Sequence, residues 1–329
     1  MITRKEFLKK SAAWGAAAVS GMAGGLPGQL ASAFAATAKN GKSRVVIIRN
    51  PAVMKDGQVN QTVVNQMLRE AMLRLTGAKS EAEAWKQFVK PTEVVGIKIN
   101  CLFGKNCSTR PEVVNAVVGG LRKAGVPERN MIVWDRSTGD LVKSGYVPNA
   151  EGPGVKVLAD DGDWEEQATK QGSFNGKLSK ILTQKITALI NAPILKDHSG
   201  AGITCAMKNH YGSFNNPGEH HGGHCDPYIA DLNALPVIKN KTRLIVCDAI
   251  MPIPQGGPGG GQTRWPYNGL MVSTDPVALD TQGWMIINAR RQETGVPILE
   301  ERRVPQLASA AARGVGTNDP AKMEVIRIG

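Results

Sequence analysis

The chain has 329 residues, of which 42% are hydrophobic and 5% aromatic, and its formal charge is +12. This length is enough for one large α/β domain or two small ones. The basic residues are dispersed rather than grouped, and few aromatic side chains are present to stack on bases, so we expect no nucleic-acid partner.

The first residues are typical of a bacterial export signal. Residues 3–9 read TRKEFLK, and small, weakly apolar residues follow to about residue 26. The opening resembles the twin-arginine signal, except that Lys5 replaces the second arginine, so a general-secretion signal is the alternative. We expect residues 1–38 to direct the chain to the export machinery, and the mature protein to be periplasmic or otherwise exported. Glycines and Pro27 interrupt the apolar run, which predicts no stable membrane span.

Residues 39–329 are expected to form a single α/β domain. Short β-branched runs alternate with amphipathic stretches, which predicts a largely parallel or mixed sheet with helices on both faces and a ligand cleft at the strand carboxyl ends. The expected strands are Arg44–Arg49, Val94–Asn100, Met131–Asp135, Val155–Leu158, Ala188–Asn191, Arg243–Asp248, Met271–Ser273 and Met323–Ile328. The expected helices are Thr62–Leu75, Glu112–Ala124, Pro227–Leu235 and Pro276–Arg290.

Two of these helices have a start signal, in which an aspartate precedes a proline. Asp226-Pro227 and Asp275-Pro276 each place a capping residue before a first-turn proline. For Asp226, capping competes with a role as a metal ligand, since the residue adjoins a cluster of histidines.

The five cysteines favour neither a zinc knuckle nor an iron–sulfur cluster, because no pair has the two-residue spacing of those sites. Cys101 and Cys107 are the nearest pair for a disulfide in an exported chain. The alternative is that Cys101 and Cys247 are buried at strand ends as small apolar side chains. The glycine-rich stretch at 254–261 lacks a P-loop ending and predicts a flexible loop.

All five histidines lie between residues 198 and 224, beside Cys225. Imidazole and thiolate groups bind transition metals, so this window predicts a site for zinc, copper, nickel or iron. We expect the last three histidines to lie on a loop, because glycines and a proline surround them. The alternative is that the flanking histidines are structural and the loop histidines solvated. The candidate ligands are His198, His210, His220, His221, His224 and Cys225.

Basic residues at or near expected strand ends predict a second feature, a pocket for a carboxylate or phosphate. The alternative is that each lysine is a surface residue whose stem lies along the sheet edge. The expected cofactor-binding residues are Lys98, Asn100, Arg110, Asn209 and Asp248. The expected catalytic residues are His198, His210, Lys196 and Lys208, and either histidine can act as a general base without a metal.

A series of separated motifs extends over nearly all of the chain beyond residue 45. They are VGIKIN at 95–100, TRPEVV at 109–114, KAG at 123–125, INAPILKDH at 190–198, MKNHYG at 207–212, CDAI at 247–250 and VSTDPVALD at 272–280. In order and spacing they resemble the bacterial and archaeal family grouped as domain of unknown function 362. The resemblance implies an α/β domain. Many relatives are exported or carry iron–sulfur modules, but no ferredoxin module is present here, and the family implies no reaction.

A more distant resemblance covers residues 108–135. Ser108-Thr109-Arg110-Pro111, the following helix and the strand to Asp135 resemble the first domain of nickel-pincer lactate racemases. Those enzymes place Asp-His before Thr-Arg-Pro, where this chain has Cys107-Ser108. A similar domain plan is implied, and racemase activity is not carried over.

Together these observations predict an exported metal- or metallocofactor-binding protein that acts on a small anionic substrate by redox or isomerisation chemistry. One alternative is a non-enzymatic periplasmic protein that handles a metal or cofactor. Another is a metal-free binder of anionic solutes that uses the lysines.

Overall fold

The structure is a computed structural model that describes residues 41–259 and 263–329. The expected export signal at residues 1–38 lies outside the described residues, as does part of the expected glycine loop. None of the helices in the described ranges is long and apolar enough to cross a membrane.

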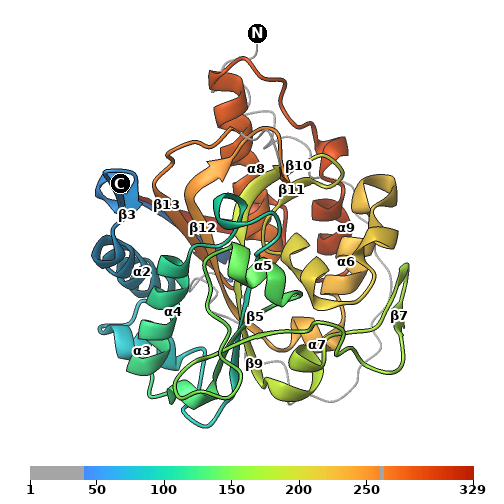
Figure 1. The fold of residues 1–329 in the computed structure, drawn as a ribbon. Helices are drawn as coiled ribbons and strands as arrows, with labels where there is room; N and C mark the ends of the chain where they lie inside the picture. Colours follow the sequence, from blue (N-terminus) through green and yellow to red (C-terminus); the bar gives the residue numbers. More distant parts are fainter. Residues whose placement is uncertain (1–40, 260–262) are drawn as a thin grey trace.

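The expected sheet is present and has ten strands (Figure 1). Its main path runs β14-β1-β13-β12-β9-β4-β5-β6, and β10 and β11 attach beside β12. The strands are β1 (Ser43–Arg49), β4 (Val95–Ile99), β5 (Met131–Asp135), β6 (Lys156–Ala159), β9 (Ala188–Ala192), β10 (Ile194–His198), β11 (Gly202–Thr204), β12 (Thr242–Ile253), β13 (Gly269–Ser273) and β14 (Met323–Ile328). Two small hairpins accompany the sheet, β2 (Met54–Lys55) with β3 (Gln58–Val59) and β7 (Thr169–Gln171) with β8 (Phe174–Gly176).

Helices cover both faces of the sheet, as the sequence predicts. Figure 1 shows α2, α3 and α4 on one side and α6 and α9 on the other. The helices are α2 (Gln61–Thr76), α3 (Glu81–Lys86), α4 (Pro111–Lys123), α5 (Thr138–Lys143), α6 (Tyr228–Asn233), α7 (Pro236–Lys239), α8 (Pro276–Glu293) and α9 (Gln306–Ala312).

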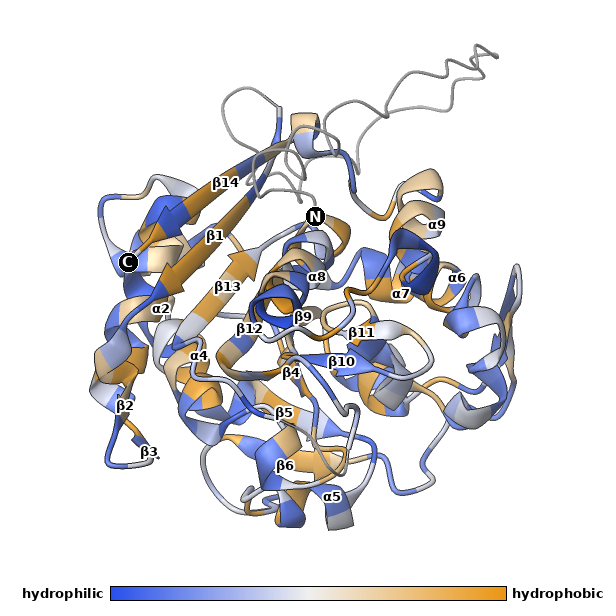
Figure 2. Cartoon of the chain, turned by 90° about the horizontal axis from the view of Figure 1, so that it is seen from above, coloured by the Kyte–Doolittle hydropathy of each residue, from blue (hydrophilic) through white to orange (hydrophobic). Residues whose placement is uncertain are grey.

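The alternation of side chains along each strand divides the interior into two cores. In β1, Val46 and Ile48 pack in the core that contains α2 to α5, whereas Val45 and Ile47 pack in the core that contains α6 to α9. Successive strand residues point to opposite faces, so a strand buried on both sides becomes a continuous apolar run. Figure 2 shows this as hydrophobic colour along β1 and β13.

Most of the expected strands are confirmed, and Met131–Asp135 and Met323–Ile328 have the predicted bounds. The sequence did not predict β10 and β11, because Lys196, Asp197 and His198 interrupt the apolar pattern of a buried strand. The strand expected to end at Asp248 instead continues to Ile253 as β12.

Only one of the two expected helix caps is confirmed. The Asp275 carboxylate accepts hydrogen bonds from the backbone N–H groups of Val277 and Ala278 at the start of α8. The prediction for Asp226 was wrong. Helix α6 begins two residues later, at Tyr228, and the Asp226 carboxylate instead accepts a hydrogen bond from the Ser309 hydroxyl at 2.9 Å.

The candidate site lies at the edge of the sheet where β12 changes its neighbour from β9 to β10. Strand β12 pairs with β9 along its first half and with β10 along its second half. Pro193 separates β9 from β10, and its carbonyl accepts from the Asp248 N–H at 2.8 Å. The β10–β11 hairpin therefore extends beyond the carboxyl ends of β4 and β9.

Two adjacent glycines of α4 provide a test of how closely the helices pack. A Cβ atom on Gly120 would lie 2.0 Å from the Trp85 ring of α3, whereas one on Gly119 would meet nothing within 4 Å. We expect Gly120→Ala to lower the free energy of unfolding by about 1–3 kcal/mol through overpacking. Gly119→Ala should raise it by about 0.5–1 kcal/mol through helix propensity. Urea unfolding measures both, and equal effects would contradict this packing.

Candidate functional site

A buried ion pair forms the floor of the site. The Lys98 ammonium, at the end of β4, donates to Asp135 Oδ1 and to the Ile99 carbonyl oxygen, both at 2.7 Å. Asp135, the last residue of β5, also accepts from the Cys101 N–H at 2.6 Å. Lys98 is 0% exposed. Its charge is thus neutralised inside the protein, and it is not the free cation that the sequence predicts for a ligand.

Arg110 and Asp248 form a second buried pair. Arg110 Nη1 contacts both Asp248 carboxylate oxygens at 2.8 and 2.9 Å, and the Arg110 N–H donates to the same group at 2.9 Å. Asp248 is 0% exposed. The pair ties the start of α4 to β12, so these two expected cofactor-binding residues are already bonded to one another.

Two further buried lysines, Lys196 and Lys208, have no carboxylate partner within the described ranges. Lys196, in β10, donates to the Cys107 carbonyl oxygen at 2.9 Å and to Asn100 Oδ1 at 3.3 Å. Lys208 Nζ lies 3.1 Å from the centroid of the Tyr211 ring. Both lysines line one cavity of about 120 Å³ at the carboxyl ends of β4 and β5.

Burial changes the acidity of both ammonium groups. It lowers the pKa of Lys196 to about 8, against the partial opposing effect of neighbouring acidic groups. Burial, with the charge of Lys196, lowers the pKa of Lys208 to about 7. An unpaired buried charge is costly, so each lysine loses its proton more readily than in water.

His198 lies at the end of β10 and also lines the cavity. Its Nδ1 accepts hydrogen bonds from the N–H groups of Gly200 and Ala201 at 3.0 and 3.1 Å. Burial, and then the charge of Lys208, lowers the pKa of His198 to about 3. The ring is therefore neutral at neutral pH, and this hydrogen-bond pattern assigns its proton to Nε2.

His221 stacks on His198, with ring centroids 5.6 Å apart. Its Nδ1 lies 2.8 Å from the Pro217 carbonyl oxygen, which can only accept, so Nδ1 carries the proton. Its Nε2 is then an acceptor and lies 3.2 Å from Lys208 Nζ. Both imidazoles are thus neutral, with the proton on Nε2 in His198 and on Nδ1 in His221, and both lie near Lys208.

Two buried polar atoms of residues that line the cavity have no hydrogen-bond partner in the described structure. They are Asn209 Oδ1 and Thr204 Oγ1, in residues that are 1% and 3% exposed. The Asn209 amide nitrogen is held by the Lys98 carbonyl oxygen and by Asn191 Oδ1. Buried polar groups are nearly always bonded, so these two atoms indicate where a ligand would be held.

Gly212 determines how closely the segment that carries Lys208 approaches the Lys98–Asp135 ion pair. A Cβ atom on Gly212 would lie 2.5 Å from Asp135 Oδ1 and 2.7 Å from Lys98 Nζ. Any side chain there would separate the ion pair. The 3-10 segment Lys208–Ser213 can therefore lie directly on the Lys98–Asp135 pair only because residue 212 is glycine.

The other candidate metal ligands face elsewhere. His220, expected on a loop, is 4% exposed because its ring packs against Phe174, Phe214 and Tyr228. His224 Nδ1 lies 3.1 Å from the Gly200 carbonyl oxygen. In residues 41–259 and 263–329, no group of three His, Cys, Asp or Glu side chains is arranged to hold a metal ion. Metal binding by the histidine window stays a prediction.

The cysteines are all free and buried. Cys101 and Cys107 form no disulfide, and Cys101 and Cys247 are buried as the alternative interpretation predicts. Cys225 lies against the hydroxyl of Tyr211, near Lys208.

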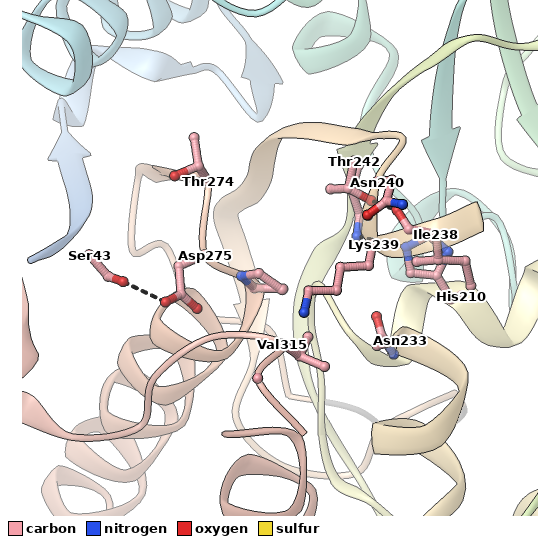
Figure 3. A pocket seen from close by; sticks show the side chains of 13 residues that line it. Ser43, His210, Asn233, Ile238, Lys239, Asn240, Thr242, Thr274, Asp275 and Val315 are labelled. Carbon is pink, nitrogen blue, oxygen red and sulfur yellow. Dashed lines mark hydrogen bonds between the residues drawn. The ribbon is translucent and has the colours of Figure 1, made fainter. Parts of the chain in front are cut away.

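His210 lines a different and larger cavity of about 250 Å³, at the amino ends of β1 and β12. Figure 3 shows Lys239 extending across this cavity and Asp275 bonded to Ser43. Asp275 is occupied as a helix cap, and His210 is bonded to Ser213 and Asn191. This cavity is larger, but its acidic group and imidazole already have partners, so the smaller cavity is the candidate site.

Sequence reasoning missed Thr204 and Tyr211 as site residues. Tyr211 could have been found, because it lies in the MKNHYG motif three residues after Lys208. Thr204 carries no such signal, since only the unpredicted β10–β11 hairpin brings it to the cavity.

The floor of the site can be tested by removing one charge. Asp135→Asn leaves the Lys98 ammonium buried without a carboxylate, and we expect it to lower the free energy of unfolding by about 3–5 kcal/mol. Asp163→Asn is the matched control, because Asp163 is an exposed carboxylate in its pair with Lys180, and it should have little effect. Urea unfolding measures both variants. An Asp135→Asn variant as stable as the unmodified protein would contradict the assigned role of the pair.

Similar proteins were found both by sequence and by structure. A thylakoid-associated protein of Synechocystis sp. is 30% identical over 206 residues, which are 59% of this chain and 62% of that protein. The chain thus spans about 62% of the length of this relative. Among solved structures, a protein from Thermotoga maritima is 10% identical with a TM-score of 0.44, over 73% of this chain and 60% of that chain. The lactate racemase apoprotein from Thermoanaerobacterium thermosaccharolyticum is 10% identical with a TM-score of 0.39, over 74% and 57%.

The family model for the Domain of unknown function (DUF362) matches residues 95–285. This range contains the buried ion pairs, the histidine window and both unpaired lysines. The family that the sequence motifs indicate is thereby confirmed, and the chain belongs to the DUF362 family.

Proposed function

We propose that the cavity at the carboxyl ends of β4 and β5 binds a small organic anion and moves a proton on it. The observation that carries this proposal is the presence of Lys196 and Lys208 in one cavity, both buried and neither paired with a carboxylate among the described residues. A bound carboxylate or phosphate supplies the missing partner, and buried charges are stable only when paired.

The uncharged groups favour an anion that also carries a hydroxyl or carbonyl oxygen. The Thr204 hydroxyl can donate to such an oxygen, and Asn209 Oδ1 can accept from a hydroxyl group. Arg136 also lines the cavity, and so does the acidic Asp140. The charged side chains around the cavity are therefore not all basic.

We propose proton transfer because a proton donor and a proton acceptor lie close together at the cavity. His198 presents an Nε2–H donor, and His221 presents an Nε2 acceptor. Lys208, with a pKa of about 7, exchanges between ammonium and amine near neutral pH. An acid and a base with pKa values displaced in this way are typical of sites that isomerise small acids.

Anion binding can be tested by changing one lysine at a time. We expect Lys196→Met and Lys208→Met each to weaken the binding of lactate, malonate or inorganic phosphate by about tenfold or more, which is about 1.4 kcal/mol. Lys239→Met is the matched control, because Lys239 is exposed and lines the other cavity. Isothermal titration calorimetry measures all three variants. Equal affinity in every variant, or no binding of any of these anions, would refute the proposal.

The same titration has an expected pH dependence. The lysines attract an anion only when they are protonated, so affinity for lactate or malonate should be high at pH 6 and fall as pH rises through the lysine pKa values of about 7 and about 8. His198 stays neutral throughout this range, because its pKa is about 3. Cys225 and His221 also face Lys208. In Lys208→Met the remaining decrease should follow Lys196 alone.

A transition-metal site is the second candidate function. The observation that favours it is the stacking of His198 and His221 beside the cavity, in a sequence window with Cys225. We propose zinc, copper, nickel or iron as the ion, with His198 and His221 as the first ligands and redox or isomerisation as the chemistry.

Elemental analysis of protein recovered from its own host, with no metal or chelator added, tests the metal proposal. We expect a near-stoichiometric metal that is lost in His198→Ala and in His221→Ala but retained in His224→Ala, since His224 faces Gly200. Metal-free protein that takes up neither zinc nor nickel would refute it.

We also propose that the chain is exported. The support is the sequence of residues 1–38 and the thylakoid association named for the Synechocystis relative. Cell fractionation of the full chain, with and without these residues, distinguishes an exported protein from one that stays in the cytoplasm.

A further inference from the structure

Lys208, His221 and Pro217 form a line of three interacting groups. Lys208 Nζ lies 3.2 Å from His221 Nε2, and His221 Nδ1 lies 2.8 Å from the Pro217 carbonyl oxygen. The carbonyl fixes the tautomer, so the His221 lone pair faces the lysine. A nucleophile within hydrogen-bond reach of a base that a third group orients is typical of covalent catalysis.

A nucleophilic lysine must also have a nitrogen that is not already held in an ion pair. The Lys98 ammonium group donates to Asp135 Oδ1 at 2.7 Å. Lys208 contacts the Tyr211 ring and has no carboxylate partner within the described ranges. Its Nζ instead lies 3.2 Å from His221 Nε2, which can take its proton. The two lysines are similarly buried, and only Lys208 has the surroundings of a nucleophile.

The second lysine of the cavity selects the substrate. Lys196 is fixed by the Cys107 carbonyl oxygen and Asn100 Oδ1, and these neutral acceptors leave its charge available to a carboxylate. An amine beside a carboxylate-binding cation suits an electrophile whose carbonyl carbon adjoins a carboxylate. We propose that Lys208 forms a reversible imine with a 2-oxo carboxylate held by Lys196, an inference that rests on the proposed anion-binding function.

The reaction balances without an oxidant or a reductant. The Lys208 ammonium gives a proton to His221 Nε2, and the nitrogen lone pair attacks the carbonyl carbon. The C–N bond forms while the C=O π electrons move to the oxygen, and a proton passes from this nitrogen to the oxygen to give a carbinolamine. The hydroxyl group then takes back the proton held by His221 and leaves as water, while the nitrogen lone pair forms the C=N bond. One ammonium group and one carbonyl group thus give one iminium group and one water molecule.

Reductive trapping tests this inference on the purified full chain. The protein is incubated with pyruvate and sodium cyanoborohydride, and intact-mass and peptide mass spectrometry locate the adduct. We expect one adduct per chain on the peptide that contains Lys208, and none there after incubation with lactate, which has no carbonyl carbon beside its carboxylate. The adduct in the unmodified protein is mapped directly, so this result does not depend on whether any variant folds.

Three variants test the roles of Lys208 as nucleophile, Lys196 as carboxylate-binding group and His221 as base, and a fourth is the control. Lys208→Arg keeps the positive charge without a nucleophilic amine, and we expect it to abolish trapping. Lys196→Met should raise the pyruvate concentration needed for trapping by about tenfold without moving the adduct. His221→Gln should slow trapping by about 100-fold and shift its pH optimum upward. Lys239→Arg should behave as the unmodified protein.

The outcomes distinguish failure of the imine from failure of anion binding. If calorimetry shows that lactate and pyruvate bind but no adduct forms on Lys208, the imine inference is wrong and anion binding stands. If neither acid binds, the proposed function is wrong as well. Adducts spread over exposed lysines, equal in Lys208→Arg and equal with uncharged acetaldehyde, would also overturn the inference.

Discussion

The site depends on how the protein pairs its buried positive charges. Lys98 and Arg110 lie at the carboxyl edge of the sheet, and each is neutralised by one carboxylate, Asp135 or Asp248. These pairs connect β4 to β5 and α4 to β12, so they hold the cleft together. With both carboxylates occupied, Lys196 and Lys208 have no carboxylate partner in residues 41–259 and 263–329, and a bound anion would supply one.

Sheet topology explains why the cavity lies where it does. In open α/β sheets a ligand usually binds where strand order changes, beyond the strand carboxyl ends. Here the change occurs between β4 and β9, because β5 and β6 follow β4 on one side and β9 pairs with it on the other. The β10–β11 hairpin brings Lys196, His198 and Thr204 over that edge. The side chains of the site therefore come from this hairpin and the 3-10 turns together with the strand end at Asp135 and the first turn of α5 at Asp140.

The sequence predicted the layers of the fold well, because they depend on local pattern. Strands such as Met131–Asp135 are continuous apolar runs, and Asp275-Pro276 marks the start of α8. The hairpin was missed because its charged residues are buried by tertiary contacts that no local pattern records. Nearness in sequence is also a poor guide to which histidines lie side by side. His198 and His221 stack although 23 positions separate them, whereas His210 faces the opposite edge of the sheet.

The 3-10 segment Lys208–Ser213 has a consequence for the molecule as a whole. Lys208, Asn209, Tyr211 and Gly212 line the cavity at the carboxyl edge, and His210, between them, lines the cavity at the amino edge. Gly212 allows the segment to lie directly on the Lys98–Asp135 pair. One short segment therefore supplies side chains to both cavities and contacts the buried ion pair of the cleft.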